Sequence, residues 1–218
     1  MHKPDFATSY ANANRILVQS QVIDRFPFPV KQLIHEQSDI RLCTFAKAIQ
    51  AGIDIYAFGS NSADLIKYGD KKILFYNDAL PIEHNRYSLL HEFGHDYNGH
   101  PLDCSDNELY DCFEIETNWF AAQLLMPAQL LRELQNYGYP LTVPFLRKAF
   151  GVSREAAAKR IENLTRMNYE WKSMEEKEFD DIILQRHQAF LDRYCKNRSD
   201  VYSYEEELNR QQERDNWY

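Results

Sequence analysis

The chain has 218 residues, and 33 acidic against 25 basic side chains give it a formal net charge of −8. This acidic balance disfavours a protein that binds nucleic acid directly through a basic surface, and the low contents of glycine (7) and proline (8) exclude a collagenous or low-complexity chain. With 44% hydrophobic residues, the chain has enough apolar material to build a sizeable core.

Two helices and a small sheet are predicted in the N-terminal part of the chain. Apolar side chains at helical spacing predict an amphipathic helix over residues 8–24, and a Phe-Pro-Phe-Pro segment separates it from a short helix over residues 30–37. Segments that are rich in β-branched or aromatic residues then predict strands at 40–45, 53–58 and 71–77.

The last of these strands is expected to belong to a hairpin at an edge of the sheet. Gly69 and Asp70 separate residues 65–67 from residues 72–76, which is the pattern of two strands joined by a tight turn. An edge strand would leave backbone groups free to pair with an extended substrate peptide. The alternative is that this strand simply pairs within the sheet.

Helical patterns follow the hairpin. One helix is predicted over residues 83–98, and a second runs from Ser105 or Leu109 to Met126, where Pro127 stops it. These two helices carry the residues that suggest chemistry.

The C-terminal part is predicted to be helical as well. Thr142 and Ser153 stand at N-cap positions on either side of a turn at Gly151, so residues 137–170 predict a helix-turn-helix-like segment. We expect this segment to pack on the rest of the protein or on a partner rather than to bind DNA, because the chain is acidic. Residues 171–218 are dense in charged side chains and predict a charged helical tail with a solvated face.

The sequence also predicts a compartment. No window approaches the roughly 18 uninterrupted apolar residues that span a bilayer, and the N-terminus lacks an export signal. The four cysteines, Cys43, Cys104, Cys112 and Cys195, form no C-x-x-C pair. We therefore expect a cytoplasmic protein with reduced thiols and no membrane partner.

His91-Glu92-Phe93-Gly94-His95 matches the H-E-x-x-H pattern of zinc-dependent hydrolases. At about 100° per residue, the two imidazoles lie one helical turn apart in similar directions and can reach one ion. Glu92 points about 100° away from His91, where it can contact a water molecule held at the open coordination position. The pattern therefore predicts two metal ligands and a general base on one helix.

A hydrolytic zinc site needs a third protein ligand, and the candidates are His100, Glu114 and Glu116. The third histidine of metzincins follows the second by six residues, whereas His100 follows His95 by five, so helix capping or a core hydrogen bond is its favoured role. Glu114 and Glu116 lie about 200° apart on one helix, so they cannot both face the same ion.

Asn118 favours Glu114 as the ligand. It lies one turn after Glu114, where its side chain can accept the outer N–H of a metal-bound histidine and fix the tautomer of that ring. Glu116 is then expected to be an exposed or ion-paired surface carboxylate. Ala121 and Ala122 are expected to let the two helices approach each other closely.

The runs Arg86–His95 (RYSLLHEFGH) and Glu114–Pro127 (EIETNWFAAQLLMP) resemble the ImmA/IrrE family of metallopeptidases. The resemblance covers roughly residues 8–167 and leaves out the tail after Trp171. One departure is Thr117, where the family usually has alanine, and we expect this change to affect packing more than chemistry.

The resemblance implies an α+β, gluzincin-like fold. A zincin-like peptidase domain with a small mixed sheet and an H-E-x-x-H helix would occupy residues 1–136. The helix-turn-helix-like segment at 137–170 and the charged tail at 171–218 would follow it.

The resemblance also implies the site and the function. His91, His95 and Glu114 would bind zinc, although Mn²⁺ or Fe²⁺ can occupy similar ligands. Glu92 would be the catalytic acid/base of an endopeptidase that site-specifically cleaves a helix-turn-helix transcriptional repressor and so derepresses a stress regulon or a mobile element.

The sequence leaves two further questions open. An endopeptidase needs a donor to the oxyanion besides the metal, and four side chains are candidates: His84, Tyr97, His100 and Tyr110. A second function class is a non-catalytic, metal-braced protein that sequesters a repressor or an antitoxin-like partner. Glu92 discriminates between the classes, because a purely structural metal site has no use for a carboxylate that does not bind the metal.

Overall fold

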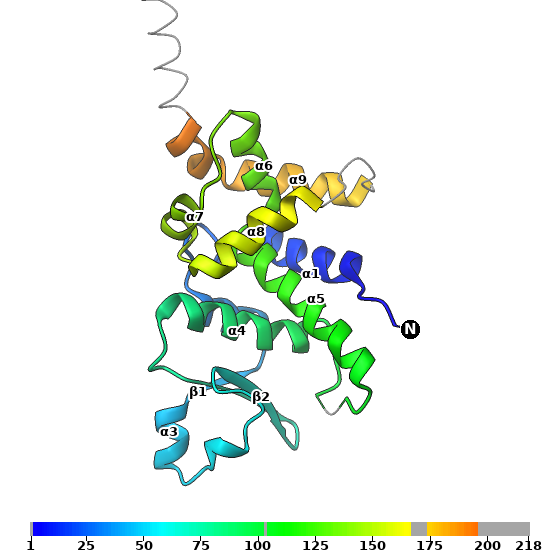
Figure 1. Ribbon diagram of the computed structural model, residues 1–218, viewed down its shortest axis with the longest axis vertical. Helices are drawn as coiled ribbons and strands as arrows, with labels where there is room; N and C mark the ends of the chain where they lie inside the picture. The colour runs from blue at the N-terminus through cyan, green and yellow to red at the C-terminus, as the bar shows by residue number, and fades with distance from the viewer. Residues whose placement is uncertain (1, 103, 167–173, 196–218) are drawn as a thin grey trace, which may run out of the picture.

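The described part of the chain combines one small mixed sheet with several helices, so the predicted α+β class is confirmed (Figure 1). The computed structural model describes residues 2–102, 104–166 and 174–195. Its elements are α1 (Phe6–Gln19), α2 (Val30–Gln37), β1 (Arg41–Thr44), α3 (Phe45–Gln50), the 3₁₀-helix η1 (Ile55–Ala57), β2 (Ala63–Tyr68), β3 (Lys71–Tyr76), α4 (Ile82–Tyr97), α5 (Asn107–Leu125), α6 (Ala128–Asn136), α7 (Val143–Phe150), α8 (Arg154–Arg166) and α9 (Met174–Arg186). A further helical stretch covers residues 188–195. Among the helices described, none is both long and apolar enough to cross a membrane.

Helix α1 is shorter than predicted. It begins after Asp5, whose carboxylate accepts a hydrogen bond from the backbone N–H of Thr8 (3.0 Å). It ends at Ser20, where the backbone is extended and the hydroxyl accepts hydrogen bonds from the backbone N–H groups of Val22 and Ile23. This local side-chain turn replaces the last predicted turn of the helix.

The sheet has the strand order β1-β3-β2. Strand β3 pairs with β1 in parallel, with Arg41 opposite Ile73, and with β2 in antiparallel, with Tyr68 opposite Lys71 at the turn. The predicted hairpin is therefore confirmed. The prediction that its second strand lies at the edge is wrong, and the alternative, pairing within the sheet, is correct.

Side chains pack on both faces of β3. Leu74 and Tyr76 belong to the large core, which includes residues of α4, whereas Phe75 joins a smaller cluster with Phe45 and Ala48 of α3. Figure 1 shows α4 over one face of the sheet and α3 over the other. Strand β3 thus has a neighbouring strand on each edge and packed side chains on both faces.

Residues 53–58 do not form the strand that the sequence predicts. The short helix η1 takes their place, and the carboxylate of Asp54 caps it by accepting a hydrogen bond from the backbone N–H of Tyr56 (3.0 Å). Phe58 packs against Phe75 of the sheet (ring centroids 4.9 Å apart). The apolar side chains that suggested a strand therefore cover the sheet instead of extending it.

Helices α4 and α5 lie where the sequence predicts them, within two residues at each end. Asp106 caps α5 by accepting a hydrogen bond from the backbone N–H of Leu109 (3.1 Å). Helix α5 packs against both α4 and α1. Helix α4 therefore lies between the sheet and α5, whereas α3 covers the other face of the sheet (Figure 1).

Helices α7 and α8 are joined by a turn in which Gly151 has a left-handed backbone (φ 63°). The hydroxyls of Thr142 and Ser153 accept hydrogen bonds from the backbone N–H groups of Phe145 (3.3 Å) and Ala156 (3.1 Å), as expected of N-caps. The buried apolar side chains of this segment belong to the same core as α4 and α5: Leu146, Ala149, Phe150, Val152, Ala157 and Leu164.

The described part of the predicted tail packs on the rest of the protein. Helix α9 contacts α1 and α6, and Ile183, Phe190 and Leu191 are buried in the large core. Glu175 and Glu178 are exposed, so this helix has the predicted solvated face. The tail beyond residue 195 lies outside the described residues.

His187, just after α9, is buried, and we therefore expect the protein to be less stable in acid. This residue is 2% exposed and its ring packs on Phe26, and neither ring nitrogen has a hydrogen-bond partner among the described residues. Burial, reinforced by the charge of Arg186, lowers the pKa of His187 from 6.5 to about 4. The unfolded chain therefore binds this proton more tightly than the folded one, and the free energy of unfolding falls as the pH drops from 6.5 toward 4.

We expect His187→Leu to remove this dependence. Between pH 7 and pH 5, His187 should lower the free energy of unfolding of the wild-type protein by about 2 kcal/mol. The variant should not show this decrease. Urea unfolding of both proteins at the two pH values measures the difference. An equal loss of stability in wild type and variant would show that other groups cause the acid sensitivity.

Candidate metal centre

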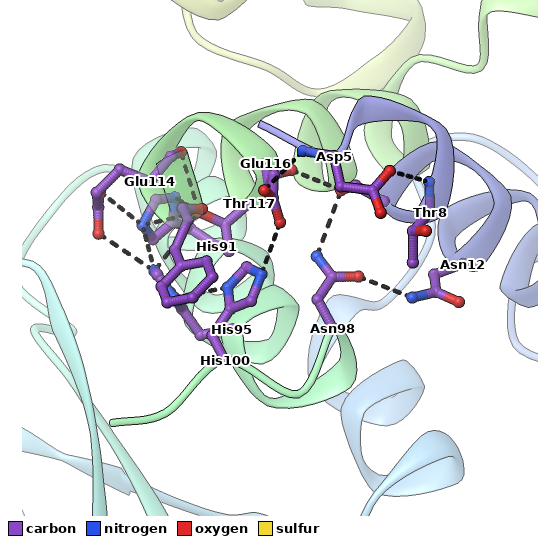
Figure 2. Close-up of polar contacts among 12 residues, drawn as sticks. Asp5, Thr8, Asn12, His91, His95, Asn98, His100, Glu114, Glu116 and Thr117 are labelled. Atoms are coloured by element: carbon purple, nitrogen blue, oxygen red, sulfur yellow. Dashed lines mark hydrogen bonds and ion pairs between the residues drawn. The ribbon is translucent and has the colours of Figure 1, made fainter. Parts of the chain in front are cut away.

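Three side chains from two helices converge on one point. His91 and His95 lie one turn apart on α4, and Glu114 reaches them from α5 (Figure 2). The Nε2 atom of His91 is 3.2 Å from Glu114 Oε2, and the Nε2 atom of His95 is 3.2 Å from Glu114 Oε1. The two Nε2 atoms are 3.3 Å apart.

These spacings suit a small divalent cation. Donor atoms at the corners of a tetrahedron with metal bonds of about 2.0 Å lie about 3.3 Å apart. Two imidazoles and a carboxylate are also a donor set of hydrolytic zinc sites, which keep one position open. The carboxylate side is accessible, since the side chain of Glu114 is 33% exposed. The three predicted ligands therefore fit a metal ion.

Glu92 lies beside this cluster and outside it. The ligand atoms of the cluster come from His91, His95 and Glu114. The carboxylate of Glu92 instead accepts a hydrogen bond from the backbone N–H of Leu65 in β2. Burial, opposed by the charge of His91 and reinforced by those of Asp64 and Glu114, raises the pKa of Glu92 to about 7. A carboxyl group of this kind can take up and release a proton near neutral pH.

Electrostatic contacts hold the cluster together. Hydrogen bonds from His91 and His95 keep the pKa of Glu114 well below its usual range. Burial acts to lower the pKa of His91, but the hydrogen bond and charge of Glu114 outweigh it and raise the pKa. Desolvation and a hydrogen bond to Glu114 raise the pKa of Tyr110 to about 12, so its phenol stays protonated beside the carboxylate.

Asn118 lies where the sequence predicts, next to His91. Its side chain hydrogen-bonds the His91 imidazole, and its Oδ1 accepts a second hydrogen bond from the hydroxyl of Tyr87 (2.7 Å). Burial raises the pKa of Tyr87 to about 12. Sequence reasoning missed Tyr87, although its position one turn before His91 on the same helix face is a signal that would have found it.

The close approach of α4 and α5 occurs at Gly94. A Cβ atom at this position would lie 2.9 Å from the Phe120 ring and 3.4 Å from the Cγ2 atom of Thr117. The sequence interpretation gives this role to Ala121 and Ala122, and Ala121 is indeed buried, but the contact itself depends on the glycine between the two histidines.

Thr117 is more than a packing residue. It is fully buried, and its hydroxyl donates to the backbone carbonyls of Phe113 or Glu114 (3.0 and 3.1 Å). The same oxygen lies 3.3 Å from His91 Nδ1 and 3.5 Å from His95 Nε2. Beside the expected effect on packing, the hydroxyl is therefore also a polar neighbour of two predicted ligands.

His100 and Glu116 lie outside the ligand cluster but next to it. The backbone N–H of His100 donates to the carbonyl of His95 (2.9 Å), which is a capping contact, and its ring makes buried hydrogen bonds to His95 and Glu116. Glu116 is 8% exposed. The expectation of a surface carboxylate is wrong, because hydrogen bonds from His100 and from the backbone N–H of Asp5 compensate its burial.

The four candidate oxyanion donors occupy different places. His84 is exposed and pairs with Ser62 (2.8 Å), and Tyr97 packs between Phe93 and Phe120. The ring of His100 is buried behind His95, as described above. Tyr110, which is 47% exposed, hydrogen-bonds Glu114 from the accessible side of the cluster.

Comparison with known families gives one match for this region. Residues 48–162, just over half of the chain, match the model of peptidase family M78, which is described as the IrrE N-terminal-like domain. The matched segment contains α4 and α5 with the whole ligand cluster, whereas α1 precedes it. No curated protein matches the chain at a significant level.

Proposed function

The chain belongs to the IrrE N-terminal-like family of metallopeptidases, and from this premise we propose that it is a zinc-dependent endopeptidase that cleaves a helix-turn-helix transcriptional repressor. The observation that carries the proposal is the cluster of His91, His95 and Glu114 with Glu92 beside it. A metal site with only a structural role would not need the partly buried carboxyl group of Glu92, which lies next to the ligands without joining them.

The chain's own residues have distinct roles in this proposal. His91, His95 and Glu114 hold the ion, and zinc, when bound, supplies a Lewis acid that makes a water molecule acidic near neutral pH. Glu92 accepts the proton of the attacking water and passes it to the leaving amine. Tyr110 is the candidate donor to the oxyanion, because its protonated phenol lies beside Glu114.

The substrate is proposed to lie along β2 rather than β3. Strand β2 is at an edge of the sheet, and the hydrogen bond from the backbone of Leu65 to Glu92 places this strand next to the proposed proton carrier. A cavity of about 680 Å³ adjoins it, lined by residues 64–67 and 99–102 together with Lys72 and Asp96. An extended peptide that adds to β2 would thus pass the site with side chains directed into this cavity.

The proposal is tested by searching the neighbouring reading frames for a helix-turn-helix repressor and incubating that repressor with this protein. We expect the zinc-loaded protein to convert that repressor into two defined fragments, seen by intact mass spectrometry. A zinc chelator should abolish the reaction, and added zinc should restore it. Should the two proteins instead form a stable complex with no fragments, the protein would be a sequestering partner and not a peptidase.

A further inference from the structure

A buried chain of hydrogen bonds leads away from the proposed metal centre behind His95. The Nδ1 atom of His95 lies 3.1 Å from Nδ1 of His100, and Nε2 of His100 lies 2.9 Å from Oε2 of Glu116. The other carboxylate oxygen of Glu116 accepts a hydrogen bond of 2.7 Å from the backbone N–H of Asp5. Figure 2 shows this row from His95 on α4 through His100 and Glu116 to the start of α1.

The contacts allow one arrangement of protons once a cation is bound. The Nε2 atom of His95 faces the ligand cluster, so its lone pair must be free and Nδ1 must carry the hydrogen. Nδ1 of His100 then accepts that hydrogen, which leaves the hydrogen of His100 on Nε2. This nitrogen faces a carboxylate oxygen that can only accept when ionised.

The surrounding residues hold this arrangement in place. The His100 ring stacks on Phe113 with centroids 4.2 Å apart and an interplanar angle of 19°. The side chains of His100 and Glu116 are 4% and 10% exposed, so water competes little for their hydrogen bonds. In addition, the hydroxyl of Ser9 donates to the backbone carbonyl of Glu116 (2.7 Å), which fixes α1 against this part of α5.

We propose that His100 and Glu116 are positioning residues that lock His95 in the tautomer and orientation required for metal binding. The inference rests on the proposed metal centre. It extends that centre beyond the segment matched to the family, because Asp5 and Ser9 precede residue 48 and yet complete the hydrogen bonds of Glu116. Outer hydrogen bonds of this kind orient a ligand and raise its basicity.

Two variants of His100 separate its hydrogen bonds from its packing. His100→Phe keeps a ring on Phe113 but offers no acceptor to His95, and we expect its zinc dissociation constant to rise by about 10- to 100-fold. His100→Gln keeps one acceptor and one donor, so it should recover part of this loss. Glu116→Gln removes the charge but keeps an acceptor, and we expect a rise of about 10-fold. Competition with a chelating dye measures these constants.

Controls separate this inference from the proposed function. His35→Phe removes an exposed imidazole of α2, outside this chain of hydrogen bonds, and should bind zinc as wild type does. Thermal unfolding of the metal-free proteins shows whether each variant is folded. The ¹⁵N chemical shifts of the His95 ring in the zinc-loaded protein should report Nδ1–H in wild type and a change in Glu116→Gln. Unchanged zinc affinity and unchanged shifts in Glu116→Gln and His100→Phe would overturn the inference while leaving the metal centre intact. Failure of the wild-type protein to bind zinc would remove both.

Discussion

Glu92→Gln is expected to bind zinc like the wild-type protein and to cleave its substrate about 100- to 10,000-fold more slowly. The glutamine has nearly the same shape, and its amide oxygen can still accept the hydrogen bond from Leu65. It cannot take up a proton, however, and proton transfer is the role that the position of Glu92 indicates. Zinc content by elemental analysis and the rate of repressor cleavage test the two halves of this expectation.

A matched control for Glu92→Gln is Glu83→Gln. Glu83 lies in the first turn of the same helix and outside the ligand cluster, so its loss removes the same charge without touching the site. This variant should keep both zinc and activity. If Glu92→Gln cleaved the repressor at the wild-type rate, Glu92 would not be the proton carrier, and another group would have to be sought.

Glu114→Gln is expected to lose zinc, with an increase in the dissociation constant larger than the 10- to 100-fold typical of changes outside the ligand set. The carboxylate lies 3.2 Å from both ligand imidazoles, and it is the one anionic member of the cluster. Its replacement removes a negative charge from the cation site, and the amide is a weaker ligand. Zinc titration monitored by calorimetry measures the change.

Glu108→Gln is the corresponding control on α5. Glu108 is exposed in the first turn of that helix, so the variant changes the net charge equally and should bind zinc with wild-type affinity. Stoichiometric zinc at unchanged affinity in Glu114→Gln would mean that the ion is held elsewhere, and the assignment of the third ligand would be wrong.

The parts of the site that the sequence predicts are local in the chain. His91, Glu92 and His95 lie within two turns of one helix, so their relative directions follow from helix geometry alone. Helix geometry also shows that Glu114 and Glu116 cannot both be ligands, and Asn118, one turn after Glu114, favours Glu114. The structure brings together the three side chains that this reasoning selects.

The parts that the sequence did not predict depend on contacts between distant segments. The hydrogen bond from Asp5 to Glu116 joins residues 111 positions apart, and nothing in either segment marks the other as its partner. In the same way, β3 becomes a central strand because β1 pairs with it in parallel, and parallel pairing has no turn that would reveal it. Residues 53–58 likewise cover the sheet where the sequence predicts a strand, because Phe58 packs on Phe75 of β3 (ring centroids 4.9 Å apart).

The glycine between the two histidines has a consequence for the kind of ion that the site selects. His91 and His95 belong to one helix and Glu114 to the other, so the distance between the helices sets the spacing of the donor atoms. Hydrogen at position 94, in place of a methyl group, lets the helices settle at donor spacings of 3.2 to 3.3 Å. Calcium takes six to eight oxygen ligands, whereas two of the three donors gathered here are imidazole nitrogens. The close helix contact thus assembles a nitrogen-rich donor set that selects against this abundant cation.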